Sequence, residues 1–229
     1  MHLVLSGEGN SDIGKLSYDS SQFIPASMYY LIDKIIEKKL HFSFYETTSD
    51  LITFIPKSEL VKVGKKLPPY TGRKFKKGQA LFLTNAISLA KLAKEKAKEC
   101  GDEDVIAILF RDSDGTRSTS SGMWEDKVAS IENGFAMEKF TKGVAMIPKP
   151  KSEAWLICAL KDPPYQQCKK LEDRSGNDNS PNNLKDELQS FNIQLETINE
   201  MIKNDEIDIE QIDMPSFISF KNRLTKLLE

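Results

Sequence analysis

Histidine and cysteine are scarce in this chain. Among its 229 residues there are two histidines, His2 and His41, and three cysteines, Cys100, Cys158 and Cys168. Zinc sites and Ser-His-Asp triads depend on histidine, and zinc sites also use cysteines at short, fixed spacings. The composition therefore argues against both kinds of site. An odd, sparse set of cysteines without metal-ligand or redox spacing indicates a reducing cytosol, so we expect a cytoplasmic protein.

Long apolar runs are also missing. No stretch approaches the roughly 20 residues that a membrane-spanning helix needs. The chain enters an apolar segment at Leu3 without a basic leader, so we expect neither a membrane span nor a signal peptide. The net charge of −2 gives no overall positive field, and any surface for nucleic acid must be local.

The bulk composition fits a soluble globular protein. Hydrophobic residues make up 39% and charged residues 29% of the chain, which suits a packed core with a well-solvated surface. The length allows one α/β domain with an appendage, or two small domains. The glycines near the N-terminus are not followed by GK[ST], so they do not form a phosphate-binding P-loop.

An unbroken apolar run over residues 106–110 leads into a pair of acids. Asp112 and Asp114 follow one residue apart, and Gly115 allows a sharp turn after them. Such a run is typical of a strand covered on both faces of a parallel sheet. Alternate side chains of an extended chain point the same way, so the two aspartates can project together beyond the strand's carboxyl end. Crowded carboxylates repel unless a cation lies between them, and their oxygens suit Mg²⁺ or Mn²⁺.

Two other expected strands also end at an acid. Residues 2–5 lead into Glu8, and residues 143–147 lead towards Glu153. Parallel strands lie about 4.8 Å apart and open their carboxyl ends on one edge, so these acids can meet in one pocket. Each also has a structural interpretation: Glu8 as a solvated turn residue, and Glu153 as a charge stabilised in the first turn of a helix.

Periodicity and capping signals predict the remaining elements. We expect further strands at residues 41–45 and 51–55, and Ser152 as the N-cap of a helix that runs through Leu160. Other helices are expected over residues 25–40, 80–100, 124–140, 184–191, 193–203 and 216–228. We interpret residues 1–160 as an α/β domain and residues 161–229 as a helical C-terminal extension.

The segment 57–78 is strongly basic and is opposed only by Glu59. Its prolines and glycines favour a loop, and Tyr70 and Phe75 lie among the charges. Such a loop can follow a phosphate backbone and stack on bases; the alternative is a solvated lysine loop. The predicted nucleic-acid-binding residues are Lys65, Lys66, Arg73, Lys74, Lys76 and Lys77.

The combined motifs resemble the Toprim family, the acidic metal-binding domain of topoisomerases, DnaG-type primases, OLD-type nucleases and small RNA-maturation nucleases. Residues 6–12 (SGEGNSD) resemble its glutamate motif, and residues 112–114 (DSD) resemble its DxD motif. Residues 147–155 and the basic Lys76–Gly78 segment look like those of a stand-alone bacterial Toprim-like family. The resemblance covers roughly residues 1–160.

The resemblance implies a Rossmann-like, mostly parallel sheet flanked by helices. It also implies that Glu8 is the general acid or base of phosphoryl transfer, although a role as a metal ligand stays open. Asp112 and Asp114 would hold Mg²⁺ (or Mn²⁺), with Glu153 completing the ligands. Asp12 is an accessory residue or a cap of the following loop.

The leading hypothesis is a metal-dependent nuclease acting on DNA or RNA, with a role in phage defence or nucleic-acid maintenance implied by the resemblance alone. The alternative is a non-catalytic module that binds nucleic acid through the basic loop, or a protein such as an ATPase through the helical tail. A small-molecule phosphatase or a nucleotide-binding protein is a third hypothesis. The lack of a glycine-rich phosphate loop and of an evident nucleophile argues against it.

Overall fold

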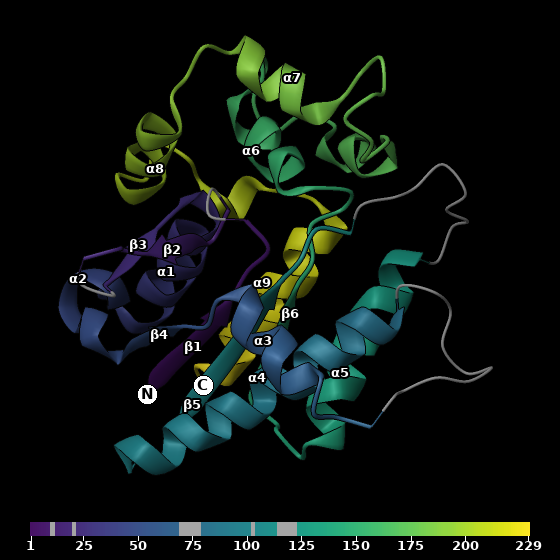
Figure 1. Cartoon of the computed structure of the whole chain (residues 1–229). Helices are drawn as coiled ribbons and strands as arrows, with labels where there is room; N and C mark the ends of the chain where they lie inside the picture. The colour runs from purple at the N-terminus through teal and green to yellow at the C-terminus, as the bar shows by residue number, and fades with distance from the viewer. Residues whose placement is uncertain (10–11, 20–21, 69–78, 102–103, 114–122) are drawn as a thin grey trace.

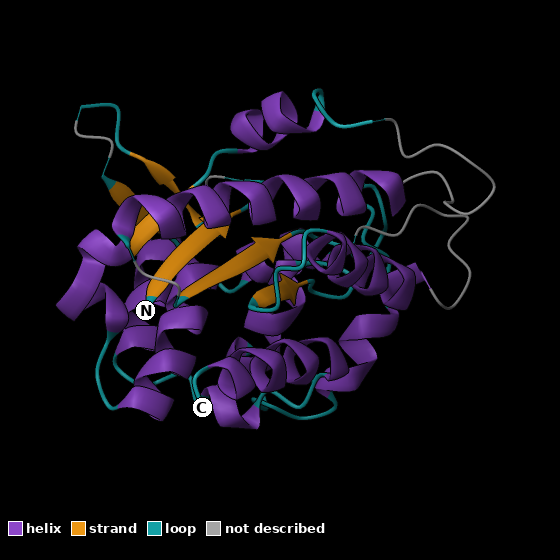
Figure 2. Cartoon of the chain, turned by 90° about the horizontal axis from the view of Figure 1, so that it is seen from below, coloured by secondary structure: helices purple, strands orange, loops and turns teal. Residues whose placement is uncertain are grey.

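A four-stranded, all-parallel sheet forms the centre of the protein, with helices on both faces (Figures 1 and 2). The computed structural model describes residues 1–9, 12–19, 22–68, 79–101, 104–113 and 123–229. In spatial order the strands are β4 (Ile52–Phe54), β1 (His2–Ser6), β5 (Val105–Phe110) and β6 (Gly143–Met146). The predicted α/β class and these four predicted strands are confirmed.

The two central strands are buried along their whole length. In their parallel register, Leu3 aligns with Ile106 and Leu5 with Ile108, and all four side chains belong to the core on one face of the sheet. The alternate residues, such as Val4, belong to the core on the other face. Burial on both faces explains why these strands are unbroken apolar runs.

One face of the sheet is covered by three helices. They are α3 (Lys57–Gly64), α4 (Gln79–Cys100) and α5 (Met123–Met137). Small residues let α4 and α5 approach closely: a Cβ on Gly134 would lie only 2.6 Å from the Cβ of Ala86. The buried alanines of α4, Ala86, Ala90 and Ala93, therefore serve close packing.

The opposite face and the carboxyl edge are covered by helices from both ends of the chain (Figure 1). These are α1 (Ser27–Leu40), α6 (Ser152–Leu160), α7 (Leu184–Ser190), α8 (Leu195–Lys203) and α9 (Pro215–Leu227). A short hairpin, β2 (Gly14–Leu16) with β3 (Phe23–Pro25), precedes α1. Three 3₁₀ turns complete the described elements: η1 (Ser49–Leu51), η2 (Cys168–Asp173) and η3 (Ile209–Gln211).

The C-terminal helices share the hydrophobic core of the sheet. Trp155 of α6 stacks on Phe220 of α9 with ring centroids 6.0 Å apart, and it meets Phe217 edge-on at 5.1 Å. The indole N–H of Trp155 donates to Ser216 Oγ at 2.9 Å. The predicted helices of the tail are confirmed, and they pack as part of this core. The predicted division at residue 160 stays a prediction.

The strand predicted at residues 41–45 is wrong. Helix α2 (Phe44–Thr48) begins there, after Ser43. The Ser43 hydroxyl oxygen accepts from the Glu46 N–H at 3.1 Å, and the hydroxyl donates to Asp33 at 2.6 Å. This N-cap, whose sequence is the Ser-x-x-Glu of a capping box, outweighs the strand preference of the aromatic residues.

The loop predicted over residues 57–78 is wrong for its first third. Residues 57–64 form α3, which begins after Pro56. The prolines and glycines that favour a loop come later in the segment, and residues 69–78 lie outside the described residues. Proline just before the first turn is compatible with a helix because it occupies a position where a backbone donor is not needed.

The described residues include one disulfide bond. Cys158 of α6 and Cys168 of η2 are joined by a disulfide, with Cα atoms 5.2 Å apart, whereas Cys100 is free and exposed. This pairing differs from the expectation of a reducing compartment, and the cytoplasmic location stays a prediction. Within the described residues, no helix is both long enough and apolar enough to cross a membrane.

Replacing Phe220 by alanine should lower the free energy of unfolding by about 3–5 kcal/mol, because a large buried ring is lost from the core. Phe220 is 1% exposed, whereas Phe42, the matched control, is 38% exposed. Phe42→Ala should change the free energy by about 0.5 kcal/mol or less. Urea denaturation of both variants checks this. Equal, small effects would mean that α9 does not contribute to the core.

Candidate active site at the carboxyl edge of the sheet

The chain stays extended beyond the end of β5. Arg111 N–H donates to the Met146 carbonyl at 3.1 Å, and Ser113 N–H donates to the Pro148 carbonyl at 3.2 Å. The alternation of side chains therefore continues past Phe110. It sends Arg111 and Ser113 towards the α4 and α5 face and Asp112 towards the opposite face.

Contacts from two helices hold this extended segment in place. The ammonium group of Lys127, on α5, donates to the Ser113 carbonyl. On the other face, Asp112 Oδ1 accepts the backbone N–H of Ser152 at 3.0 Å. Asp112 thus occupies the N-terminus of α6, where unpaired N–H groups and the helix dipole favour a negative charge.

The predicted N-cap of α6 is displaced by one residue. Lys151 occupies the cap position, but its side chain makes no capping hydrogen bond, and Ser152 is the first helical residue. The Ser152 hydroxyl is therefore not the cap, and Asp112, forty residues away in the sequence, supplies the capping oxygen. Sequence periodicity cannot reveal a cap that comes from a distant strand.

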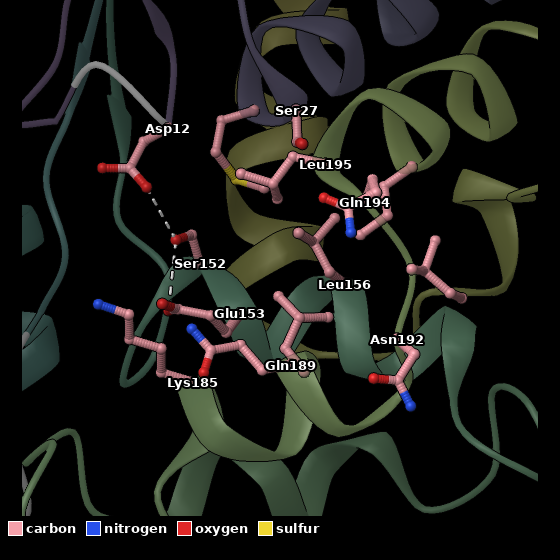
Figure 3. Close-up of a pocket in the computed structure, with 14 residues that line it drawn as sticks. Asp12, Ser27, Ser152, Glu153, Leu156, Lys185, Gln189, Asn192, Gln194 and Leu195 are labelled. Carbon is pink, nitrogen blue, oxygen red and sulfur yellow. Dashed lines mark hydrogen bonds between the residues drawn. The ribbon is translucent and has the colours of Figure 1, made fainter.

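Ser152 joins carboxylates from separate parts of the chain. Its Oγ donates to Asp12 Oδ1 at 3.4 Å and lies 3.5 Å from Glu153 Oε2 (Figure 3). Asp12 is held at the start of α1, because its carbonyl accepts the Met28 N–H at 3.0 Å. Asp12, Asp112 and Glu153 therefore gather around one serine at the carboxyl edge.

The electrostatics of Asp12 reflect this crowding. Burial raises the pKa of its carboxyl above the ordinary 3.8, and the negative charges of Glu153 and, more weakly, Glu8 raise it further. The hydrogen bonds from Ser152 and the Gly9 N–H only partly oppose the shift. The edge thus carries negative charge that the described residues do not fully balance.

Glu8 lies at the same edge but faces a cation. Its carboxylate pairs with Lys57 Nζ, at the start of α3, at 3.0 Å. Both side chains are substantially exposed, so the pair contributes little to stability. The charge of Glu8 also raises the pKa of Asp12 and supports the positive charge of Arg111. Glu8 therefore interacts electrostatically with both Asp12 and Arg111.

Arg111 is a buried cation with unused donors. It is 1% exposed, and its Nη1 donates to the Phe110 carbonyl at 2.6 Å, whereas Nε and Nη2 have no hydrogen-bond partner among the described residues. Burial lowers the pKa of its guanidinium to about 10, against the opposing charge of Glu8. An unpartnered buried donor costs about 1–3 kcal/mol, which marks Arg111 as a candidate functional residue.

Two further buried side chains on the α4 side of the sheet lack partners. Ser6 aligns with Leu109, two residues before Arg111, and its Oγ makes no hydrogen bond; Asn85 of α4 has an unpaired Nδ2. Sequence reasoning missed all three residues. The available signal was Arg111 itself, a cation placed directly between an apolar strand and the first acid.

The predicted nucleic-acid-binding residues are only partly described. Lys65 and Lys66 follow α3 and are exposed. Arg73, Lys74, Lys76 and Lys77 lie outside the described residues. The basic surface therefore stays a prediction, and Lys57 and Lys127 are the cations that the structure places next to the strand ends.

The structure describes two of the three predicted metal ligands, Asp112 and Glu153. Asp112 and Glu153 lie on either side of Ser152, and Asp114 lies outside the described residues. Among the residues with described positions, no three His, Cys, Asp or Glu side chains are close enough to hold a metal ion. The oxygen donors fit Mg²⁺ in kind, and the predicted ligand set stays a prediction.

A cavity of about 490 Å³ opens beside these acids (Figure 3). Asp12, Ser152 and Glu153 line one side, and residues of α1, α7 and α8 line the rest. Acids from the sheet edge and the helices α1, α7 and α8 therefore surround one space. No pattern in the sequence indicates this cavity, because its walls come from residues as far apart in the chain as Asp12 and Ile198.

No protein-family model, curated protein sequence or solved structure matches this chain. The resemblance to the Toprim family therefore stays a prediction that rests on the motifs at residues 6–12 and 112–114.

Replacing Asp12 by asparagine should raise the melting temperature at pH 7. The folded state raises the pKa of Asp12, so ionisation above the usual value of 3.8 destabilises the fold, and a neutral side chain removes that cost. The difference should shrink as the pH falls towards and below 3.8, where both proteins are neutral at this position.

Thermal unfolding across this pH range is the measurement. Asp213→Asn is the control, because Asp213 is an exposed partner of Lys169 and surface pairs contribute little. A melting temperature of Asp12→Asn below that of the wild type at pH 7, recovering at low pH, would contradict the electrostatic account.

Proposed function

We propose that the protein is a metal-dependent phosphodiester hydrolase that acts on nucleic acid. The observation that supports this most is the meeting of Asp12, Asp112 and Glu153 around Ser152, with Glu8 close enough to perturb Asp12. Such a cluster at the carboxyl edge of a parallel sheet suits a site for a cation and a phosphate.

Each acid of the site has a proposed role that follows from its position. Asp112 and Glu153, with Asp114, would hold Mg²⁺, which when bound supplies charge neutralisation and activates water. Glu8 is exposed enough to exchange protons with solvent, and it would accept or donate the proton of the reacting water or leaving group. The Lys57 ammonium keeps this carboxylate oriented at the edge.

Arg111 would bind a phosphate oxygen. Its two unpaired donor nitrogens point to an anionic partner that the fold itself does not supply. A guanidinium forms paired hydrogen bonds to phosphate more readily than any other side chain.

A non-catalytic nucleic-acid-binding module is the second candidate. It is favoured by the capping role of Asp112, which gives that acid a structural reason to be present, and by the lack of a three-residue ligand group among the described positions. Under this alternative, binding depends on the lysines and survives neutralisation of the acids.

Cleavage of labelled single- and double-stranded DNA and RNA in Mg²⁺ or Mn²⁺ tests the proposal. Glu8→Gln should reduce the rate about 100-fold or more, because proton transfer is lost. Asp112→Asn should cause a comparable loss yet keep the fold, since asparagine also caps helices well. Glu99→Gln, at the far end of α4, is the matched control. Cleavage that persists in both site variants would refute the hydrolase.

Arg111→Met should separate stability from activity. Removing the unpartnered guanidinium should raise the free energy of unfolding by about 1 kcal/mol, while loss of the phosphate contact should slow cleavage about tenfold or more. Urea denaturation and the cleavage assay measure the two effects. A variant that is both less stable and fully active would show that Arg111 is a structural residue.

A further inference from the structure

The cavity beside Asp12 and Glu153 has two chemically different parts (Figure 3). The part next to the strand ends carries the two carboxylates, with Lys185 on the same side. The part between the helices is lined by buried aliphatic side chains, including Met28, Leu156 and Ile198. An occupant must therefore present an apolar body to the helices and a polar end to the acids.

The rim of the apolar part offers hydrogen-bonding groups. Gln189 and Gln194 are exposed, and within the described residues their side-chain amides make no hydrogen bond. Each amide provides both a donor and an acceptor. A flat, neutral ring with polar atoms along its edge matches this combination of aliphatic walls and amide rim.

The charged side chains that line the cavity determine how a ligand is oriented in it. Two carboxylates and one ammonium line the cavity, so a bare anion would be repelled from its interior. A neutral base can enter the apolar part, while its phosphate stays outside that part, beside Lys185. The volume of about 490 Å³ falls in the range of pockets that bury small organic ligands.

We propose that this cavity receives the unpaired base of one nucleotide, and that the substrate is therefore single-stranded nucleic acid or a duplex with an unpaired end. A paired base is stacked between its neighbours and must leave the stack to enter an enclosed pocket. The inference rests on the proposed function for the fate of the phosphate, but the base pocket can be tested by binding alone.

The test measures equilibrium binding by fluorescence anisotropy. The full-length Glu8→Gln protein in Mg²⁺ is titrated into a labelled 12-nucleotide single strand, the same strand with one abasic site at each position in turn, and a blunt duplex of the same sequence. Glu8→Gln serves as the background for every variant so that binding is measured without hydrolysis.

Leu195→Trp fills the cavity from its rim. Leu195 is 42% exposed, so the fold should tolerate the larger ring. Met137→Trp, at the end of α5 and 53% exposed, is the matched control. Leu195→Trp should weaken binding of the single strand about tenfold, as expected when one base loses its contacts. An abasic site at one position should weaken binding by a similar factor, and the control should change neither value.

Two results would overturn the base pocket: unchanged single-strand binding in Leu195→Trp, or a blunt duplex that binds as tightly as the single strand. Displacement of the strand by a free mononucleotide at the strand's own Kd would also overturn it in favour of a nucleotide-binding site. Displacement only at far higher concentration supports the strand.

The two proposals fail in different ways. Lost single-strand binding in Leu195→Trp, with no cleavage by the wild type, keeps the base pocket and rejects the hydrolase. Cleavage that depends on Glu8 and Asp112, with strand binding unaffected by Leu195→Trp, keeps the hydrolase and rejects the pocket.

Discussion

The hydrogen bond from the Ser152 N–H to Asp112 connects the central strand to helix α6, and the rest of the site depends on it. It fixes the start of α6, and thereby the Ser152 hydroxyl and the Glu153 carboxylate. Through that hydroxyl it also places Asp12, which comes from the loop before α1. The attraction of one carboxylate for a helix N-terminus brings other carboxylates within range of mutual repulsion. The raised pKa of Asp12 is the cost of that arrangement.

The end of β5 also separates charges of opposite sign. Because the chain stays extended to Ser113, Asp112 faces α6 while Arg111 faces α4. Glu8 interacts with Lys57, Asp12 and Arg111. One strand end thus presents acids on one side and a guanidinium on the other. A phosphate group with an accompanying cation carries the complementary charges, because the cation is attracted to the acids and the phosphate to the guanidinium.

The sequence predicted the sheet well because burial on both faces leaves an unambiguous apolar pattern. It predicted that Glu8, Asp112, Asp114 and Glu153 converge, because parallel strands share one carboxyl edge, and that site stays a prediction. It failed at α2, where a local capping box outweighs aromatic strand propensity. The capping role of Asp112 and the unused donors of Arg111 depend on contacts between distant segments. Such contacts leave no periodic signal in a single chain.

The aromatic contact between α6 and α9 has a practical consequence for anyone who shortens this chain. The motifs that suggest an enzyme all lie before residue 160, which invites expression of that fragment alone. Removing α9 would uncover the indole of Trp155, and with it the apolar face of β6 that α9 now covers. Exposed surface of this kind promotes aggregation. An inactive or insoluble fragment would then reveal nothing about the chemistry of the intact protein.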